Sequence, residues 1–268
     1  MDVKLVARTL DLFELFAAEQ RPLPLAEMAR LLNIPVSSCL ALARTLLSRG
    51  YLYEVRKRGG YYPTRRLQLL SSAIDAVDPV VEMLHPRLLE LRNATGETSV
   101  LGKIHDTSVM YLDVVESEKD VRYSCPPGTL RPLHANSIGK VIFGELSAEA
   151  QQALGARLLF QRYTSATAPD LATLIDQAHA AHARGWYANM GESVPELSAV
   201  AVALNIGGDF YGFSVGGPTE RIRQHLDAHV ATLVEIKQRI LAALALETAH
   251  PGAPVRGGGT SRTQAKSA

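Results

Sequence analysis

Hydroxyl and basic side chains gather near the N-terminus of this 268-residue chain, at a spacing that suits contact with a polyanion. In the segment 37–48, polar positions fall between apolar ones at helical spacing, so a helix would carry them on one outward face. Those polar positions are Ser37, Ser38, Arg44 and Thr45. A run of cations follows at Arg56, Lys57 and Arg58. Side chains on an exposed helix contact base edges and clustered cations bind phosphates, so the two groups together predict a DNA-binding surface.

A helix-turn-helix followed by a β-hairpin is needed to position these side chains. Apolar residues recur at helical spacing over 25–32, and the Asn-Ile-Pro sequence at 33–35 interrupts the pattern with a turn. A second helix is predicted over 37–48 and ends before Gly50. The segment 51–62 is typical of two short strands around a Gly-Gly turn, which places the three cations at the tip of a wing. The outward face of the second helix would then enter a major groove.

Charge is distributed unevenly along the chain, although the formal net charge is only +1. Residues 1–66 contain 11 Lys and Arg against 6 Asp and Glu, whereas residues 67–249 contain 14 against 21. Because contacts with phosphates supply most of the sequence-independent affinity for DNA, this asymmetry assigns DNA binding to the basic N-terminal part. A winged helix that contacts only protein is the alternative.

Length and composition favour an ordinary soluble protein with about two domains. The sequence has no apolar run of membrane-spanning length and no signal-peptide pattern, so we expect a cytoplasmic location and no membrane partner. Cys39 and Cys125 fall in different predicted domains and are expected to be reduced thiols. The predicted organisation is a winged helix-turn-helix, a helical linker, an effector domain and a flexible Gly/Pro/Ser-rich tail, at 1–66, 67–77, 78–249 and 250–268.

The remainder of the chain mixes helices and strands without a regular βαβ repeat. Asp78 precedes Pro79 as a helix N-cap would, and Pro86 should kink or break the helix that follows. Strands are predicted at 98–104, 108–115, 122–125, 198–205 and 210–215. Helices are predicted at 65–76, 136–146, 147–154, 170–184 and 219–246. This order predicts an α+β fold with a mostly antiparallel sheet.

Three stretches, in order and spacing, resemble the IclR (isocitrate lyase regulator) family of bacterial transcription regulators. They are VARTL, LAEMA, IPVSS and RGYL between residues 6 and 52; TGET, GTLRPLHA and GK between 95 and 140; and RGW, Glu192 and SVGGPTER between 184 and 221. The resemblance implies a GAF-like effector domain joined to the winged helix-turn-helix. It also implies a small organic or aromatic acid as effector, and a homodimer or dimer of dimers on a palindromic double-stranded DNA operator. We expect no cofactor.

The resemblance also implies a ligand pocket. The corresponding positions are Leu130, Ser137, Ile138, Asn189, Ala199 and Ser214. Ser137, Asn189 and Ser214 could hydrogen-bond a ligand, and the other three would supply apolar walls. Asn136 is suited to cap the following helix, whose first N–H groups could receive a carboxylate, so we expect acid binding without an arginine. In the alternative, Ser137 only caps the helix and Ser214 pairs across the sheet.

The chain departs from the family pattern at Val36 and Ala41, where the family usually has basic residues, so the operator sequence cannot be carried over. Two pocket positions differ as well: Ile138 replaces a small residue and Gly216 replaces a second hydroxyl. A different ligand is therefore expected.

Enzymatic and metal-binding roles are less favoured. Cys125 precedes a double-proline turn rather than opening a helix that would lower its thiol pKa, which argues against a nucleophilic pair with His134. Histidines are paired at 179 and 182 and at 225 and 229, but such pairs on amphipathic helices are more often surface residues. The second pair also lacks the glutamate of a zinc-protease motif. We expect neither an enzyme nor a metal site. The competing hypothesis is a small-molecule-binding or enzymatic domain whose winged head mediates protein contacts or oligomerisation.

One further element is expected ahead of the helix-turn-helix. A helix over 4–18 would carry an apolar stripe of Val6, Leu10, Phe13 and Phe16. This stripe is a candidate dimer surface as well as part of the core of the head.

Overall fold

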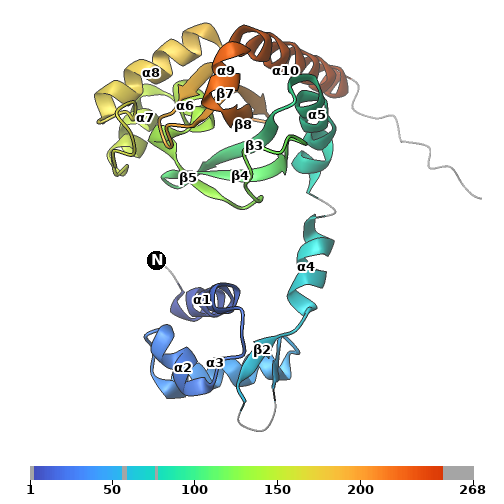
Figure 1. Cartoon of the computed structure of the whole chain (residues 1–268), viewed down its shortest axis with the longest axis vertical. Coiled ribbons are helices and arrows are strands. Elements are labelled where there is room, and N and C mark those ends of the chain that lie inside the picture. Colours follow the sequence, from blue (N-terminus) through green and yellow to red (C-terminus); the bar gives the residue numbers. More distant parts are fainter. Residues whose placement is uncertain (1–2, 56–58, 76–77, 250–268) are drawn as a thin grey trace, which may run out of the picture. The chain divides into compact units, whose positions relative to one another are not determined.

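The computed structural model describes residues 3–55, 59–75 and 78–249 (Figure 1). The chain divides into two compact units, Met1–Glu82 and Met83–Ala268. The predicted wing-tip residues Arg56, Lys57 and Arg58 lie outside the described residues, as does the predicted tail at 250–268.

The first unit is a winged helix-turn-helix. Its elements are α1 (Lys4–Glu19), α2 (Leu25–Leu31), α3 (Val36–Ser48), β1 (Leu52–Glu54), β2 (Tyr61–Pro63) and α4 (Arg66–Asp75). The axes of α2 and α3 meet at 114°, and Asn33 in the turn between them has a φ of 52°. Gly50 ends α3 with a φ of 75°, a conformation that glycine adopts without strain. β1 and β2 then pair antiparallel with Tyr53 opposite Tyr62, so the predicted helix-turn-helix and hairpin are confirmed.

The core of this unit forms where the apolar faces of α1, α2 and α3 meet. Its fully buried side chains include Leu12, Met28 and Cys39. The stripe expected on α1 is divided, because Phe16 is buried in this core whereas Val6 and Leu10 are more than half exposed. Part of the apolar surface of α1 therefore lies outside the core of the described residues.

The second unit is built on an antiparallel sheet covered by helices on both faces. Its strands are β3 (Thr98–His105), β4 (Ser108–Val115), β5 (Leu130–Pro132), β6 (Tyr187–Met190), β7 (Leu197–Ile206) and β8 (Asp209–Pro218), in the order β5-β4-β3-β8-β7-β6. Its helices are α5 (Pro79–Thr95), α6 (Ser137–Glu145), α7 (Ala148–Gly155), α8 (Leu171–Arg184), α9 (Thr219–Gln224) and α10 (Leu226–Ala249), with a 3-10 turn at Leu133–Ala135. The α5 helix begins at the end of the first unit. The predicted α+β fold is confirmed.

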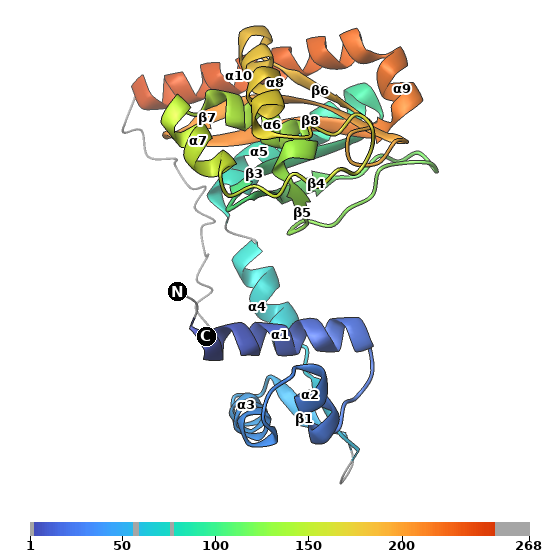
Figure 2. The same ribbon diagram turned by 90° about the vertical axis from the view of Figure 1, so that its left-hand side faces the viewer.

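Adjacent residues of β3 show how the two faces are covered. Val100 packs in one core with Ile138 and Ile142 of α6. The neighbouring Ser99 donates a hydrogen bond from Oγ to the carbonyl oxygen of Leu88 in α5, at 2.8 Å. Because successive strand residues point to opposite faces, α5 and α6 lie on opposite sides of the sheet. Figure 2 shows the same layering within this unit from a second direction.

The Asp78 cap is confirmed, since its Oδ1 accepts hydrogen bonds from the N–H groups of Val80 and Val81, both at 3.0 Å. Of the kink or break expected at Pro86, the break is wrong, because α5 continues through the proline, and the kink stays a prediction. The predicted final helix is divided at His225 into α9 and α10.

The sheet edges differ from the prediction. The segment 122–125 is not a strand, since the backbone carbonyl of Tyr123 accepts a hydrogen bond from the Thr98 side chain at 2.5 Å instead of joining a strand ladder. The edge position beside β4 is taken by β5, and β6 was not predicted.

Among the described residues, no single helix is long and apolar enough to cross a membrane. The bent pair α2 and α3 meets the length and composition of a membrane span when the two helices are taken together.

Candidate effector site and DNA-binding face

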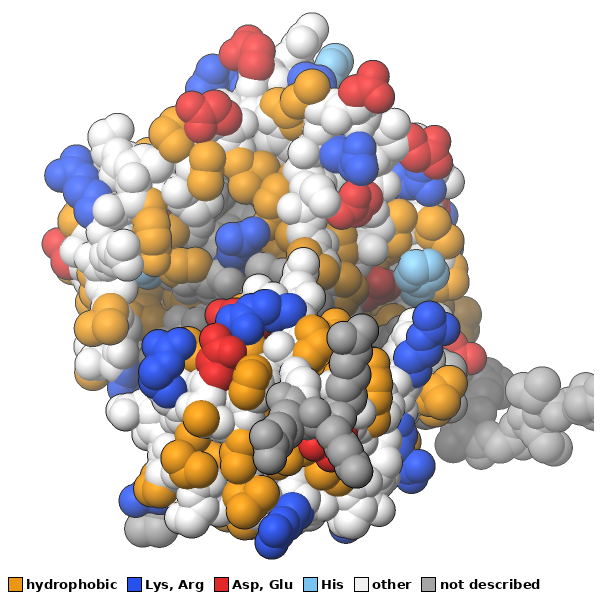
Figure 3. All heavy atoms as spheres, turned by 60° about the horizontal axis from the view of Figure 1, so that its bottom comes forward, with side chains coloured by type: hydrophobic (Ala, Val, Ile, Leu, Met, Phe, Trp, Pro, Cys, Tyr) orange, Lys and Arg blue, Asp and Glu red, His pale blue; other side chains and the backbone are white. Residues whose placement is uncertain are grey.

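The outer face of α3 carries the side chains predicted to contact DNA. Ser37, Arg44 and Thr45 are exposed, and Ser38 is half-buried. The opposite face is buried in the core of the unit through Cys39, Leu42, Ala43 and Leu46. Figure 3 brings the N-terminal unit forward and shows Lys and Arg side chains around its visible face, with hydrophobic, uncharged and a few acidic side chains between them. The helix is therefore anchored on one side and presents polar groups on the other.

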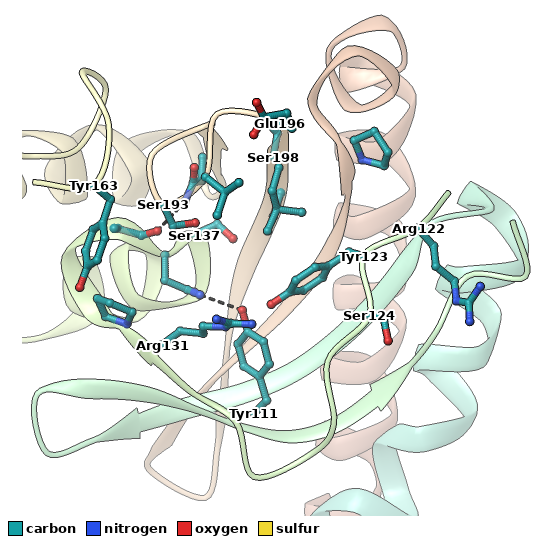
Figure 4. Close-up of a pocket in the computed structure, with 18 of the residues that line it drawn as sticks. Tyr111, Arg122, Tyr123, Ser124, Arg131, Ser137, Tyr163, Ser193, Glu196 and Ser198 are labelled. Atoms are coloured by element: carbon teal, nitrogen blue, oxygen red, sulfur yellow. Dashed lines mark hydrogen bonds between the residues drawn. The ribbon is translucent and has the colours of Figure 1, made fainter. Parts of the chain in front are cut away.

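The C-terminal unit contains a cavity of about 730 Å³ (Figure 4). Its walls come from β4, β5, the start of α6, β6 and β7, and from the loops at 121–124 and 193–196. The polar side chains in the lining are Tyr111, Arg122, Tyr123, Ser124, Arg131, Asn136, Ser137, Tyr163, Asn189, Ser193, Glu196 and Ser198. The apolar ones are Val121, Pro132, Ala135, Val194, Leu197, Ala199 and Pro218. A cavity of this size and mixed lining is typical of a small-molecule site.

Of the six residues predicted to line a pocket, the structure brings three together at this cavity, and these are Ser137, Asn189 and Ala199. The other three are not among its lining residues. Leu130 is 52% exposed at the sheet edge, and its neighbour Arg131 enters the cavity instead. A shift of one residue along a strand turns a side chain to the opposite face, which explains why Arg131 lines this cavity and Leu130 does not.

Ile138 and Ser214 are part of the packed interior. Ile138 is 1% exposed and lies against Gly212, where a Cβ atom added to the glycine would come within 2.3 Å of the isoleucine Cγ2. The Ile138 side chain therefore fills the space in the sheet that Gly212 leaves by having no side chain. Ser214 is buried in β8, opposite Val100 on one side and Ala201 on the other.

The start of α6 is already capped. The Oδ1 atom of Asn136 accepts hydrogen bonds from the N–H groups of Ile138 and Gly139, at 2.9 and 3.3 Å. The predicted cap is confirmed, but these two N–H groups are occupied by it rather than left for a carboxylate. The other end of the Asn136 amide donates to the hydroxyl of Tyr111 at 2.9 Å. The expectation that the helix N-terminus holds an acid is therefore not supported by this geometry.

Arg131 is a cavity residue that the sequence analysis missed. Figure 4 shows its guanidinium group and the hydroxyl ends of Tyr111 and Tyr123 directed toward the same region of the cavity. The guanidinium carbon lies 5.9 Å from the centre of the Tyr123 ring, and Nε is buried without a hydrogen-bond partner. Burial raises the pKa of both phenols, which are therefore neutral near pH 7 and able to donate hydrogen bonds.

One wall of the cavity is held by a buried ion pair. Lys140 is fully buried, and its Nζ contacts the carboxylate of Glu192, the Oε1 atom of Gln177 at 2.5 Å and the hydroxyl of Tyr187 at 3.1 Å. Burial lowers the pKa of Lys140 although Glu192 opposes this shift. Asn189 adds to the same wall, since its Oδ1 accepts from the N–H of Glu192 at 2.9 Å. The ion pair therefore connects α6 and α8 to the chain that borders the cavity after β6.

A second ion cluster holds the opposite wall. Glu97 is 1% exposed and accepts two hydrogen bonds from Arg221, at 2.7 and 2.8 Å, and one from Lys119 at 2.9 Å. Although burial opposes ionisation, these hydrogen bonds keep the pKa of the Glu97 carboxyl below its usual range. Arg221 also donates to the backbone carbonyl of Val121 at 2.7 Å. This cluster thereby fixes the loop that carries Tyr123 to the cavity.

The geometry gives little support to a nucleophilic cysteine or to a metal site. Burial raises the pKa of the Cys125 thiol, whereas a nucleophilic cysteine needs a lowered pKa. His134 donates from Nε2 to the carbonyl oxygen of Gln161 at 2.9 Å. Within residues 3–55, 59–75 and 78–249, no group of three or more His, Cys, Asp and Glu side chains is placed to hold a metal ion.

Comparison with known proteins identifies the class of protein that this fold and cavity define. The C-terminal domain of bacterial IclR transcriptional regulators matches residues 72–241, and the IclR helix-turn-helix domain matches residues 5–56. The first match alone covers more than half of the chain. The chain belongs to the IclR family of bacterial transcription regulators, and it is a DNA-binding regulator with a ligand-responsive C-terminal domain.

Individual relatives agree with this assignment. The chain is 28% identical over 222 residues to the transcriptional regulator BhcR of Paracoccus denitrificans, a match that covers 82% of this chain and 79% of the relative. It is 27% identical over 224 residues to the acetate operon repressor of Salmonella typhimurium, covering 82% of each chain.

Solved structures share the fold. The IclR protein of Thermotoga maritima superimposes with a TM-score of 0.73 at 18% identity, over 91% of this chain and 99% of that one. An IclR homologue of Microbacterium hydrocarbonoxydans, crystallised with 4-hydroxybenzoate, gives 0.74 at 18% identity, over 90% and 99%.

Proposed function

We propose that this regulator responds to a small organic acid of aromatic size that binds in the cavity of the C-terminal unit. The observation that carries the proposal is the cavity of about 730 Å³, which is bordered by three tyrosines and an inward-directed arginine. Such a volume suits a ring-sized ligand better than an acid of two or three carbons. The 4-hydroxybenzoate complex of the Microbacterium homologue supports the same class of ligand. The protein acts as a cytoplasmic regulator and not as an enzyme.

The N-terminal unit is proposed to bind an operator through the outer face of α3. Base edges are contacted by the four side chains predicted for this role, Ser37, Ser38, Arg44 and Thr45, and phosphates by the wing cations Arg56, Lys57 and Arg58. Two copies of the chain bind a palindromic site, and the exposed Val6 and Leu10 of α1 supply apolar surface for the dimer. We propose functional boundaries at 1–66, 67–77 and 78–249, with effector binding shifting the populations of head arrangements through 67–77.

Thermal unfolding of the full chain tests the acid-binding proposal. Benzoate, 4-hydroxybenzoate and phenylacetate are expected to raise the unfolding temperature of the C-terminal unit, because a ligand that binds only the folded state stabilises it by about 2.7 kcal/mol at 100 times its Kd. Pyruvate should have a smaller effect at equal concentration, since it fills little of the cavity. The readout is differential scanning fluorimetry across a concentration series.

A cavity-filling variant supplies the control. Ala199 lines the cavity and is half-buried, so Ala199→Phe should occupy the space while the variant remains folded. It is expected to lose the shift that the acids cause in the wild-type chain. If none of the acids shifts the wild-type transition at millimolar concentration, the proposed acid response is wrong.

A further inference from the structure

We infer that Arg131 is the group that holds the carboxylate of the effector, and that the cavity selects monocarboxylates over both neutral analogues and dicarboxylates. This inference deepens the proposed function and rests on it. The sequence alone suggested acid binding by a helix N-terminus without an arginine. The cavity instead presents a guanidinium group beside two neutral phenols.

Arg131 is distinguished from the other cations by its orientation and its partners. Arg122 also lines the cavity, but its Nε donates to Glu116 at 3.1 Å, and Figure 4 shows its guanidinium turned away from the tyrosine cluster. Lys140 is saturated by Glu192 and its other partners and does not line the cavity. Among the described lining residues, Arg131 is thus the cation directed into the cavity.

The hydrogen-bonding capacity around Arg131 is incomplete without a ligand. Its Nε is buried and unpartnered, and a buried donor without a partner is costly. The hydroxyl oxygen of Tyr111 accepts from Asn136, and the Tyr111 hydroxyl also shares a hydrogen bond with Tyr123. Tyr123 is neutral and hydrogen-bonds Tyr111, Cys125 and the Arg131 side chain, so an entering carboxylate would take over part of these bonds as well as satisfy Nε. A carboxylate can accept from an arginine and from phenols at once, and charge-assisted hydrogen bonds of this kind are the strong ones.

The occupied cap of α6 removes the competing anion site. Asn136 uses the N–H groups of Ile138 and Gly139, so a carboxylate placed there would have to displace it. The anion is therefore held on the side of the cavity formed by β4 and β5, where Tyr111 and Arg131 originate.

The distribution of charge sets the preference for one carboxylate. The acidic lining residue is Glu196, and Figure 4 shows it on the opposite side of the cavity with its carboxylate turned away from Arg131. Apolar side chains, Val194 and Leu197 among them, lie in the same wall. An acid anchored at Arg131 would extend its apolar body toward this wall, and a second carboxylate would lose hydration against apolar side chains there without gaining a cation.

Isothermal titration of the full chain with matched ligands tests the inference. Benzoate, benzamide and terephthalate share one ring and differ in charge, and 4-hydroxybenzoate and phenylacetate extend the set of monocarboxylates. In the wild-type chain, the monocarboxylates are expected to bind about tenfold or more tightly than benzamide and terephthalate, since one charge-assisted hydrogen bond is worth at least that factor. Arg131→Gln should bring benzoate and benzamide to similar affinities.

Two controls keep the outcomes separate. Arg122→Gln removes a lining cation that points away and should retain the preference of the wild type, and Arg131→Lys should retain part of it, because the charge remains. If Arg131→Gln binds benzoate as tightly as the wild type, or if the wild type favours benzamide, Arg131 is not the anchor and the inference is wrong while acid binding stands. If the wild-type chain binds no acid in the set, the proposed function itself fails.

Discussion

Replacing Lys140 with methionine is expected to lower the free energy of unfolding of the C-terminal unit by about 3–5 kcal/mol, the range for removing one partner of a buried ion pair. The lysine is fully buried, and its loss leaves the carboxylate of Glu192, which is 4% exposed, without a compensating charge. The Tyr187 hydroxyl still donates to Glu192 at 2.7 Å, but one neutral donor replaces little of the stabilisation that the Lys140 ammonium gives this carboxylate. We expect the wall of the cavity beyond β6 to loosen in the same variant.

Urea unfolding followed by tryptophan fluorescence measures this effect. Trp186 is the single tryptophan of the chain and directly precedes β6, so its signal reports on the C-terminal unit. The double variant Lys140→Met with Glu192→Met should recover most of the loss, because replacing both members of a buried pair with apolar groups is often nearly neutral. If the free energy of unfolding of Lys140→Met lies within about 1 kcal/mol of the wild-type value, Glu192 is not held as a buried carboxylate.

Replacing Arg44 with alanine is expected to weaken operator binding by about 1–3 kcal/mol, which corresponds to about 5- to 150-fold in Kd. Arg44 lies on the exposed face of α3, opposite the buried Ala43 and Leu46 side. Alanine is the strongest helix former, so the change should remove the contact without disturbing the helix. If the contact is to a base edge, the loss appears for operator DNA and is much smaller for unrelated DNA.

A surface arginine outside the N-terminal unit provides the matched control. Arg223 in α9 is 61% exposed by side chain and pairs with Glu220, so Arg223→Ala removes the same charge without touching α3. It should bind operator DNA as the wild type does. Arg44→Ala binding with unchanged affinity would mean that α3 is not the recognition helix.

The sequence predicted well the elements that are specified by local signals. The Asp78 cap and the β4 strand over Ser108–Val115 agree with the structure, because capping chemistry and alternation are set by neighbouring residues. The helix-turn-helix agrees for the same reason, since its turn is marked by an Asn-Ile-Pro sequence between two periodic segments.

The parts that were missed depend on contacts between distant residues. The edge strands β5 and β6 are three and four residues long, and they form because a neighbouring strand offers them hydrogen bonds. Lys140 and Glu192 are 52 positions apart, and Glu97 and Arg221 are 124 apart, so their pairing emerges only with the sheet. Arg131 was overlooked because the side of a short edge strand cannot be read from three residues.

DNA binding by the full chain tests the central claim most directly. Fluorescence anisotropy should be measured with DNA from upstream of the chain's own gene and with a scrambled duplex, each over a series of salt concentrations. Our account predicts tighter binding to the upstream DNA and a steep loss of affinity with salt, as phosphate contacts by a basic head require. Weak binding that is the same for both duplexes, with or without benzoate, would contradict it.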